Sequence, residues 1–363
     1  MAGCIFVPGQ PSYGHSELER LLTVAKPSVI LTQRAHSDTL LEAEGKVSCS
    51  GLDRKSTFIF DDDILDNTGR SFLDVPHWQE MVGFLDDKGW EYSNVRSSLD
   101  YNSTIVIMFT SGTTGHPKGV EISHRNYISA AVSYMQRVSL HPYWQQSMNN
   151  VGKGINPIRV LGALGMHHIL GQTSYSVVLS KLGVPLYLLC RPSVQNIVNA
   201  VETFKISDAI IRSSMLTEIA KGLTCNPVEK LRSLRRVEAS AAPMEQLTKT
   251  ILEQIGIGRV TRVWELTDRI VNRNNIGDIW IRAPSLSRGY YHNPEATSDA
   301  YGADGWFSTG DVGYVDEHRM WYIVDRKKDL IKVNGNHVAP TELEAVLLRH
   351  LKIVDAGIIG VAV

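Results

Sequence analysis

The stretch Thr110-Ser-Gly-Thr-Thr-Gly-His-Pro-Lys-Gly-Val120 decides how the rest of this chain is interpreted. An apolar run at 104–109 leads into it and predicts a buried strand, and a helical pattern begins at about Ser123. Glycines let backbone N–H groups approach an anion, hydroxyls donate hydrogen bonds, and a lysine adds a mobile positive charge. The residues that carry these groups are Thr110, Ser111, Gly112, Thr113, Thr114, Gly115 and Lys118. The stretch predicts a polyphosphate site without the spacing of a Walker A loop, and a glycine-rich surface turn is the alternative.

Composition excludes several classes of protein. The chain has 363 residues and a formal net charge of −1, so no overall field attracts nucleic acid or anionic lipid. Its 4 cysteines lie far apart and fit neither a metal-ligand spacing nor a disulfide framework, which favours a reducing compartment. We expect no membrane span and no signal peptide, and the ending Val361-Ala-Val363 is no peroxisomal tripeptide. The default expectation is therefore a cytoplasmic protein.

Downstream of the opening stretch, helix and strand patterns alternate. Strands are predicted at 184–189, 209–212 and 236–239, and helices at 172–181, 194–204, 215–221 and 244–255. Upstream, a helix is predicted at 17–24 and short strands at 28–32 and 57–60. The alternation argues for an α/β fold, a doubly wound parallel sheet with crossover helices. Such sheets bind ligands at the carboxyl ends of their strands, where we expect the 110–120 stretch to lie.

The character of the sequence changes at about Gly277. Short strands at 277–283, 313–315 and 320–324 predict a β-rich lobe, and the charged stretch 326–329 reads as a hinge before another strand and a helix from Pro340. These changes divide the chain at 276 and 325. A family resemblance, carried by the motifs quoted next, implies that 1–276 is a partial large N-terminal domain, 277–325 its β-rich lobe, and 326–363 the hinge and the start of a small α+β C-terminal domain.

The stretch 110–120 resembles the phosphate-binding signature of the adenylate-forming superfamily. This superfamily includes acyl-CoA synthetases, aryl-CoA ligases such as 4-coumarate–CoA ligase, luciferases and peptide-synthetase adenylation domains. Further segments of the chain resemble other motifs of this superfamily, and they follow one another along the sequence in the same order as in the family. The resemblance implies an enzyme that uses ATP and Mg²⁺ to activate a small carboxylic acid as acyl-AMP and transfers it to coenzyme A.

Two segments of the first 276 residues resemble motifs of the acid and adenine pockets. In Gly165-Met-His-His-Ile169, His168 falls on the family's histidine beside the acyl pocket, and an ordinary core histidine is the alternative. In Ala239-Ser-Ala-Ala-Pro243, the resemblance places Ala241, Ala242 and Pro243 against the adenine ring and substrate. A tight turn from strand to helix explains these small residues almost equally well.

The segment Trp264-Glu-Leu-Thr-Asp268 matches the family pattern imperfectly. The resemblance assigns Trp264 to stacking on adenine, Thr267 to the phosphates and Asp268 to magnesium. Glu265 stands where the family has glycine, which places bulk and negative charge beside a polyanion. Few residues separate Asp268 from the strand expected at Gly277, whereas typical members carry a much longer segment there.

Two later segments complete the resemblance. In Gly305-Trp-Phe-Ser-Thr-Gly-Asp311, the Asp311 carboxylate is assigned to the ribose hydroxyls. Beyond it, the resemblance assigns Arg326 to the ribose, Lys328 to the hinge, Lys332 to the adenylate and Gly335 to the thiol-acceptor tunnel. A solvated basic turn is the alternative for the residues around Lys328.

The sequence thus predicts an ATP-dependent acyl- or aryl-acid–CoA ligase. The residues expected to take part in catalysis are Lys118, His168, Thr267 and Lys332. The alternative is a catalytically impaired, truncated homologue that only binds a nucleotide or a partner. Three features favour this alternative. Two are Glu265 and the short segment after Asp268, and the third is that the chain reaches Val363 before the position of the family's distal catalytic lysine. The acid, the acceptor thiol and the oligomeric state stay open, and some family members are peroxisomal.

Overall fold

The structure is a computed structural model of the chain. It describes residues 4–47, 56–60, 78, 100–110, 117–149, 158–222, 228–240, 260–262, 276–317, 321–333, 336–347, 353 and 356–361. The chain forms two compact units: Met1–Ile128 with Ser285–Asp299, and Ser129–Pro284 with Ala300–Val363. The division predicted at residues 276 and 325 concerns the family's domains and stays a prediction.

The first unit begins with two helices that pack on each other and a short parallel sheet. Their contact is apolar, with Leu21 and Leu22 of one helix buried against Leu40 and Ala43 of the other. The elements are α1 (His15–Ala25), β1 (Ile30–Thr32), the 3-10 turn η1 (Arg34–His36), α2 (Ser37–Lys46) and β2 (Thr57–Ile59), with β1 parallel to β2. The helix and the two strands predicted for this region are confirmed.

The first unit also holds an antiparallel sheet in the order β11-β4-β3. Its strands are β3 (Thr104–Phe109), β4 (Gly119–Ser123) and β11 (Gly289–Tyr290), and α12 (Pro294–Ala300) follows the last of them. Phe109 pairs with Gly119, so the stretch 110–120 connects and enters the two strands of a hairpin. Its predicted place at the carboxyl end of a parallel strand is therefore wrong. The five residues of β4 have a polar Glu121 at their centre, and their weak strand pattern merges into the helical pattern of α5 (His124–Ser139).

The second unit is built on a five-stranded parallel sheet in the order β6-β5-β7-β8-β9. The strands are β5 (Val160–Gly162), β6 (Leu186–Leu188), β7 (Asp208–Arg212), β8 (Arg236–Ser240) and β9 (Val260–Arg262). The other elements are α6 (Pro142–Asn149), α7 (Ile169–Gly171), the π-helix η3 (Gln172–Leu179), α8 (Ser180–Leu182), α9 (Val194–Phe204), α10 (Ser213–Gly222) and the 3-10 helix η4 (Val228–Leu231). Every neighbouring pair of strands runs parallel. The predicted doubly wound α/β fold is confirmed, and the helix predicted at 244–255 lies outside the described residues.

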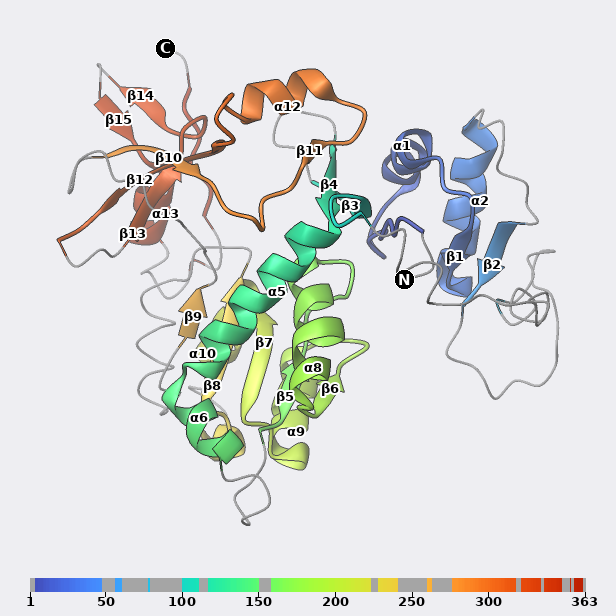
Figure 1. Ribbon diagram of the computed structural model, residues 1–363. Coiled ribbons are helices and arrows are strands. Elements are labelled where there is room, and N and C mark those ends of the chain that lie inside the picture. Colours follow the sequence, from blue (N-terminus) through green and yellow to red (C-terminus); the bar gives the residue numbers. More distant parts are fainter. Residues whose placement is uncertain are drawn as a thin grey trace. The chain divides into compact units, whose positions relative to one another are not determined.

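Helices cover both faces of this sheet (Figure 1). Successive side chains of a strand point to opposite faces, and β7 shows the result. Ala209 and Ile211 join the core formed with α9 and α10, whereas Ile210 joins the core formed with α5, α6 and the π-helix. Burial on both faces is what a parallel sheet with crossover helices requires.

The last part of the second unit is mostly β-structure. β10 (Gly277–Ile281), β12 (Phe307–Val315) and β13 (Trp321–Arg326) form an antiparallel sheet in the order β10-β12-β13. β14 (Ile331–Val333) and β15 (Asn336–Val338) form a hairpin ahead of α13 (Pro340–Leu347). The predicted β-rich lobe is confirmed, with β12 longer than expected.

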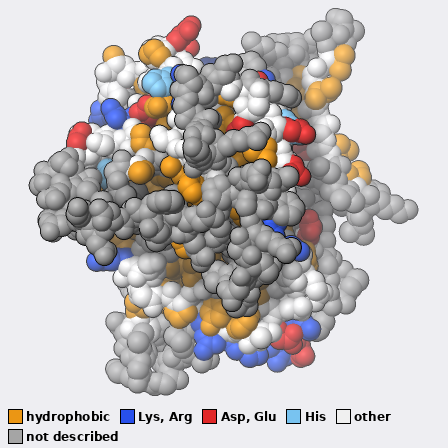
Figure 2. Space-filling model, turned by 90° about the vertical axis from the view of Figure 1, so that its right-hand side faces the viewer, with side chains coloured by type: hydrophobic (Ala, Val, Ile, Leu, Met, Phe, Trp, Pro, Cys, Tyr) orange, Lys and Arg blue, Asp and Glu red, His pale blue; other side chains and the backbone are white. Residues whose placement is uncertain are grey.

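The described surface shows mixed chemistry. In the face drawn in Figure 2, Lys and Arg side chains lie near Asp and Glu side chains and among hydrophobic ones. In the part of the chain that the structure describes, none of the helices has both the length and the apolar character needed to cross a bilayer.

Candidate nucleotide site

The structure describes seven of the residues assigned to the site. These are Thr110, Lys118, His168, Asp311, Arg326, Lys328 and Lys332. The others lie outside the described residues: Ser111, Gly112, Thr113, Thr114, Gly115, Ala241, Ala242, Pro243, Trp264, Thr267, Asp268 and Gly335. Their assignments rest on the sequence alone.

Thr110 and Lys118, at the two ends of the stretch assigned to the phosphates, are hydrogen-bonded to each other. The Thr110 N–H donates to the Lys118 carbonyl oxygen at 3.0 Å, which extends the β3–β4 ladder by one step. The Lys118 side chain is half-buried, and its Nζ lies 5.1 Å from the centroid of the Tyr290 ring. Tyr290 could not be expected from sequence patterns, because its strand β11 is only two residues long.

Asp311 and Arg326 meet on neighbouring strands. They face each other in the β12–β13 ladder, and Arg326 Nε lies 3.1 Å from Asp311 Oδ1. Asp311 is 5% exposed, whereas the Arg326 side chain is 50% exposed. Burial raises the pKa of the Asp311 carboxyl, Arg326 opposes this shift, and Asp325 adds to it. A buried carboxylate of this kind is stabilised by further hydrogen-bond donors, such as the hydroxyl groups of a sugar.

The turn after β13 is anchored on its N-terminal side. The Lys327 N–H donates to the Gly310 carbonyl oxygen at 2.9 Å, and Lys327 Nζ lies 2.7 Å from Asp278 Oδ2. Gly310 has a φ of 74°, a left-handed conformation that favours glycine. Lys328 lies exposed in the turn that follows, and Lys332 lies in β14 opposite His337. The predicted hinge role of Lys328 stays a prediction.

His168 lies at the N-terminus of α7 beside a second histidine. The rings of His167 and His168 are 4.3 Å apart between centroids. Burial lowers the pKa of both imidazoles, and the positive charge of Arg212 lowers both further. The backbone is tightly packed here, because a Cβ on Gly171 would lie 2.6 Å from the Gly165 carbonyl oxygen. His168 thus presents a neutral, flat polar ring at neutral pH.

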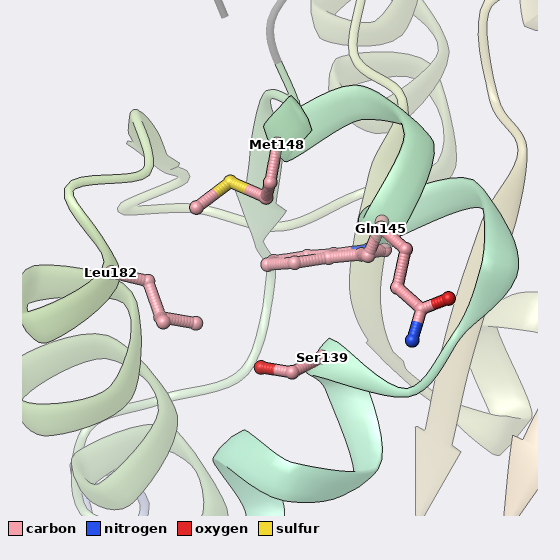
Figure 3. A pocket seen from close by; sticks show the side chains of 5 residues that line it. Ser139, Gln145, Met148 and Leu182 are labelled. Atoms are coloured by element: carbon pink, nitrogen blue, oxygen red, sulfur yellow. The ribbon is translucent and has the colours of Figure 1, made fainter. Parts of the chain in front are cut away.

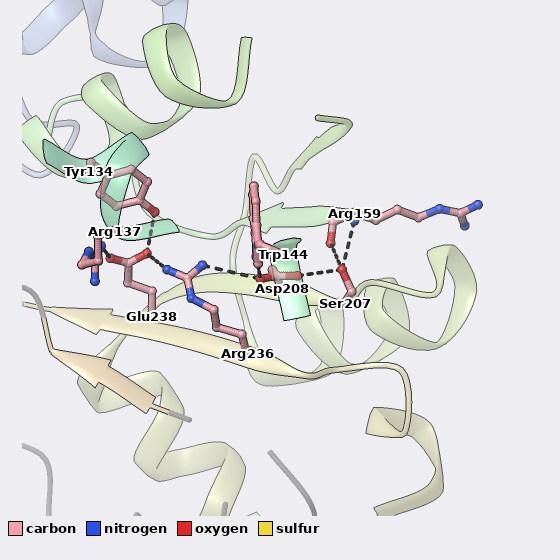
Figure 4. Close-up of polar contacts among 8 residues, drawn as sticks. All are labelled: Tyr134, Arg137, Trp144, Arg159, Ser207, Asp208, Arg236 and Glu238. Atoms are coloured by element: carbon pink, nitrogen blue, oxygen red, sulfur yellow. Dashed lines mark hydrogen bonds and ion pairs between the residues drawn. The ribbon is translucent and has the colours of Figure 1, made fainter. Parts of the chain in front are cut away.

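A buried polar network lies on the parallel sheet of the second unit (Figure 4). This network was not predicted from the sequence. Glu238 on β8 is fully buried, and it accepts hydrogen bonds from Tyr134, Arg137 and Arg236. Arg236 Nη1 also lies 3.5 Å from Asp208 Oδ1. Trp144 Nε1 and Ser207 Oγ donate to Asp208 at 2.8 and 2.7 Å. Because the charges of Glu238, Arg236 and Asp208 pair with one another, we interpret the network as structural.

One open cavity of about 370 Å³ lies beside this network (Figure 3). Its lining residues are Ser139, Trp144, Gln145, Met148 and Leu182. None of them was assigned to the nucleotide site. Among the described residues, no group of three or more His, Cys, Asp or Glu side chains is arranged to hold a metal ion.

Comparison with a family profile decides the family. A profile described as AMP-binding enzyme matches residues 1–268, which include the stretch 110–120, His168 and Asp268. The chain belongs to the AMP-binding enzyme family. The predicted relationship to adenylate-forming enzymes is therefore confirmed.

Curated relatives of this AMP-binding protein include plant ligases. A 4-coumarate--CoA ligase-like 2 of Arabidopsis thaliana is 29% identical over 74% of this chain and 52% of its own length. A 4-coumarate--CoA ligase 1 of Oryza sativa subsp. japonica is 28% identical over 99% of this chain and 66% of its own length. The chain thus spans about half to two thirds of the length of these relatives.

Solved structures share the fold at lower identity. The ATP-bound MatB of Rhodopseudomonas palustris has a TM-score of 0.72 and 20% identity, over 94% of this chain and 67% of its own. The amide bond synthetase McbA of Marinactinospora thermotolerans has a TM-score of 0.73 and 21% identity, over 99% and 72%. At this identity the likeness concerns the fold of the AMP-binding protein alone.

Proposed function

We propose that this chain belongs to an ATP-dependent acid–CoA ligase. The carboxylate of the acid would attack the α-phosphate of ATP, forming acyl-AMP and releasing pyrophosphate. The thiol of coenzyme A would then displace AMP and form the thioester. The observation that carries the proposal is the buried Asp311 carboxylate opposite Arg326, the two residues that the family resemblance assigns to the ribose.

The described residues divide the work of binding. Lys118 would neutralise charge on the phosphates, and the carboxylate of Asp311 would accept hydrogen bonds from the ribose hydroxyls. His168, neutral at neutral pH, would line the acid pocket without attracting the acid electrostatically. Such a site accelerates the reaction by positioning and by stabilising developing charge.

The remaining roles rest on sequence. Trp264 would stack on the adenine, Thr267 would contact the phosphates, and Asp268 would hold Mg²⁺. The metal, when bound, would neutralise negative charge on the phosphate oxygens. Lys332 would lie near the adenylate, and Gly335 near the path of the coenzyme A thiol.

The acid and the compartment are narrower proposals. The names of the plant relatives and the small residues at 241–242 favour an aromatic or medium-length acyl acid. The cytoplasm is the proposed compartment, although one relative of Arabidopsis thaliana is named a peroxisomal OPC-8:0-CoA ligase.

A second candidate function is nucleotide binding without turnover. It is favoured by Glu265, which stands where the resemblance expects glycine. A negative side chain beside a triphosphate disfavours ATP more than AMP, because AMP carries less negative charge.

Pyrophosphate release separates the two functions. The chain is mixed with ATP, Mg²⁺ and a panel of aromatic and aliphatic carboxylic acids, and pyrophosphate is measured with and without coenzyme A. Asp311→Ala should abolish release, whereas Asp299→Ala, on the exposed side of α12, should leave it unchanged. Nucleotide binding without pyrophosphate from any acid would favour the second function.

A further inference from the structure

The side chain of Lys118 has an aromatic partner. Its Nζ lies 5.1 Å from the centroid of the Tyr290 ring, within the range of a cation–π contact. We propose that Tyr290 is a positioning residue, which holds the Lys118 ammonium in place before a polyphosphate binds. This inference rests on the proposed function, because that function gives Lys118 its phosphate.

The contact follows from the register of the sheet. Tyr290 pairs directly with Val120 in the antiparallel β11–β4 ladder, so the two side chains share one face. Lys118 precedes Val120 by two residues and therefore lies toward the same face. Diagonal neighbours across an antiparallel pair are within reach when one is aromatic and the other long. Backbone pairing thus brings the ring and the ammonium together.

The backbone of Tyr290 is itself anchored. Its N–H donates to Thr297 Oγ1 at 2.9 Å, and this hydroxyl donates to the Asn293 carbonyl oxygen at 2.8 Å. Gly289 makes the anchor possible: it has a φ of 139°, and a Cβ there would lie 2.5 Å from Thr297 Cγ2. The ring that contacts Lys118 is therefore supplied by a strand end fixed to α12.

The contact with the Tyr290 ring reduces the conformational entropy that Lys118 loses when a phosphate binds. A free lysine side chain has many rotamers, and ordering them on binding weakens affinity. A lysine already held over a ring has fewer rotamers to lose, and it keeps its charge free for the anion. ATP should benefit more than AMP, because the β- and γ-phosphates supply most of the negative charge.

Three variants test this role by calorimetric binding of ATP and AMP to the whole chain. Tyr290→Leu removes the ring and should weaken ATP about 2- to 30-fold, the range expected for a cation–π contact, with a smaller loss for AMP. Tyr290→Phe keeps the ring and should bind ATP like the unmodified protein. Tyr291→Leu is the matched control, because Lys118 Nζ lies over the Tyr290 ring, whereas the half-buried Tyr291 ring pairs with His292.

Nuclear magnetic resonance tests the contact without any nucleotide. Lysine labelled with ¹³C at Cε is incorporated, and the Lys118 signal is identified by its loss in Lys118→Arg. A proton above an aromatic face is shielded, so the Lys118 Hε signal should lie upfield of exposed lysines. The displacement should persist in Tyr290→Phe, vanish in Tyr290→Leu and shrink in Thr297→Val, which removes the anchoring hydroxyl but not the ring.

Each result has one meaning. An unshifted Lys118 signal in the unmodified protein overturns the contact, whatever the variants do. A shifted signal with equal ATP affinity in Tyr290→Leu and the unmodified protein overturns the positioning role. A shifted signal in a protein that binds no ATP overturns the proposed function and leaves the contact itself supported. If Tyr290→Leu fails to fold, Thr297→Val decides: undiminished ATP affinity there would overturn the positioning role.

Discussion

Asp311 is buried and is also assigned to bind the ribose. Burial favours the neutral form of its carboxyl, whereas accepting hydrogen bonds from sugar hydroxyls favours the charged form. Burial raises the pKa of its carboxyl in the folded protein, so the charged form costs stability above that pKa. The cost fades as the pH falls through the raised folded-state pKa, because the folded protein then binds a proton first. A buried carboxylate whose pKa is raised in this way is a candidate for a binding role.

Asp311→Asn should therefore stabilise the fold and weaken the nucleotide. At pH 7 we expect a gain on the order of 1 kcal/mol, since a buried charge becomes a neutral amide and the half-exposed Arg326 turns to water. Thermal unfolding at pH 7 and pH 4 checks this, and the gain should shrink at the lower pH. Asp299→Asn is the control. A loss of stability at pH 7 would show that the Asp311–Arg326 pair outweighs the burial cost.

Lys118 should discriminate between nucleotides by their charge. Lys118→Ala should weaken ATP by about tenfold or more, roughly 1.4 kcal/mol, and weaken AMP much less. Calorimetry with both nucleotides measures this, with Lys181→Ala in α8 as the control. Equal losses for ATP and AMP would instead assign Lys118 to the folding of the hairpin.

At the scale of the element, strand β8 carries two charges into a fully covered sheet. Arg236 and Glu238 alternate with Val237 and Ala239. This pattern predicts a strand with one solvent-exposed polar face and one buried apolar face. In the structure, α5 and α6 cover the polar face. Tyr134 and Arg137 on α5 donate hydrogen bonds to Glu238, and the ring of Trp144 on α6 lies 6.0 Å from the Arg236 guanidinium carbon. The charges are thus satisfied by the layer that buries them.

Removing the charge of Glu238 should be costly. Glu238→Gln leaves Arg137 without its anion and leaves Arg236 with only the longer contact to Asp208. Breaking a buried pair costs roughly 3–5 kcal/mol. Thermal unfolding should then occur roughly 10 °C lower. The control is Glu229→Gln, which breaks the exposed pair with Arg232 and should change little. Similar effects of both substitutions would mean that water reaches the network.

The same strands show how far the sequence alone could predict the fold. Apolar runs such as 104–109 and 209–212 are strong local signals, and their strands were predicted within a residue or so. β4 was missed because its five residues lie between a glycine-rich stretch of sequence and a helix. The partners of Glu238 could not be predicted either, since Tyr134 and Arg137 are distant in sequence and only the packing of α5 brings them to β8.

For the candidate site, matches to family motifs identified more residues than hydrophobic periodicity did. Asp311 and Arg326 were assigned from their motifs, and the β12–β13 register brings them together. Tyr290 could not be found in the same way, because a two-residue strand has no periodicity to measure. Tyr290 comes close to Lys118 only because β11 pairs with β4.

At the scale of the molecule, the assigned nucleotide residues lie in both the profile-matched part and the part after it. The family profile covers residues 1–268, and Asp311 and Arg326 follow in the β-rich lobe. Between them lies the segment after Trp264, where Glu265 stands at the position of the glycine that the family resemblance expects and few residues precede Gly277. Binding and adenylation therefore make different demands on the chain: the residues assigned to the ribose and phosphates are present, and the sequence departs from the family pattern in the segment that the resemblance assigns to the reacting phosphate.

We predict that ATP binds while adenylation is slowed by Glu265. Adenylation brings a second anion, the carboxylate, to the α-phosphate, and a nearby negative side chain opposes that approach. Glu265→Gln removes the charge and keeps the size, whereas Glu265→Gly removes both. If charge is the obstacle, both should raise pyrophosphate release about tenfold, which corresponds to roughly 1.4 kcal/mol in the barrier. If bulk is the obstacle, Glu265→Gly alone should do so. No gain from either variant, in a protein that still binds ATP, would move the cause to the shortened segment that follows Asp268.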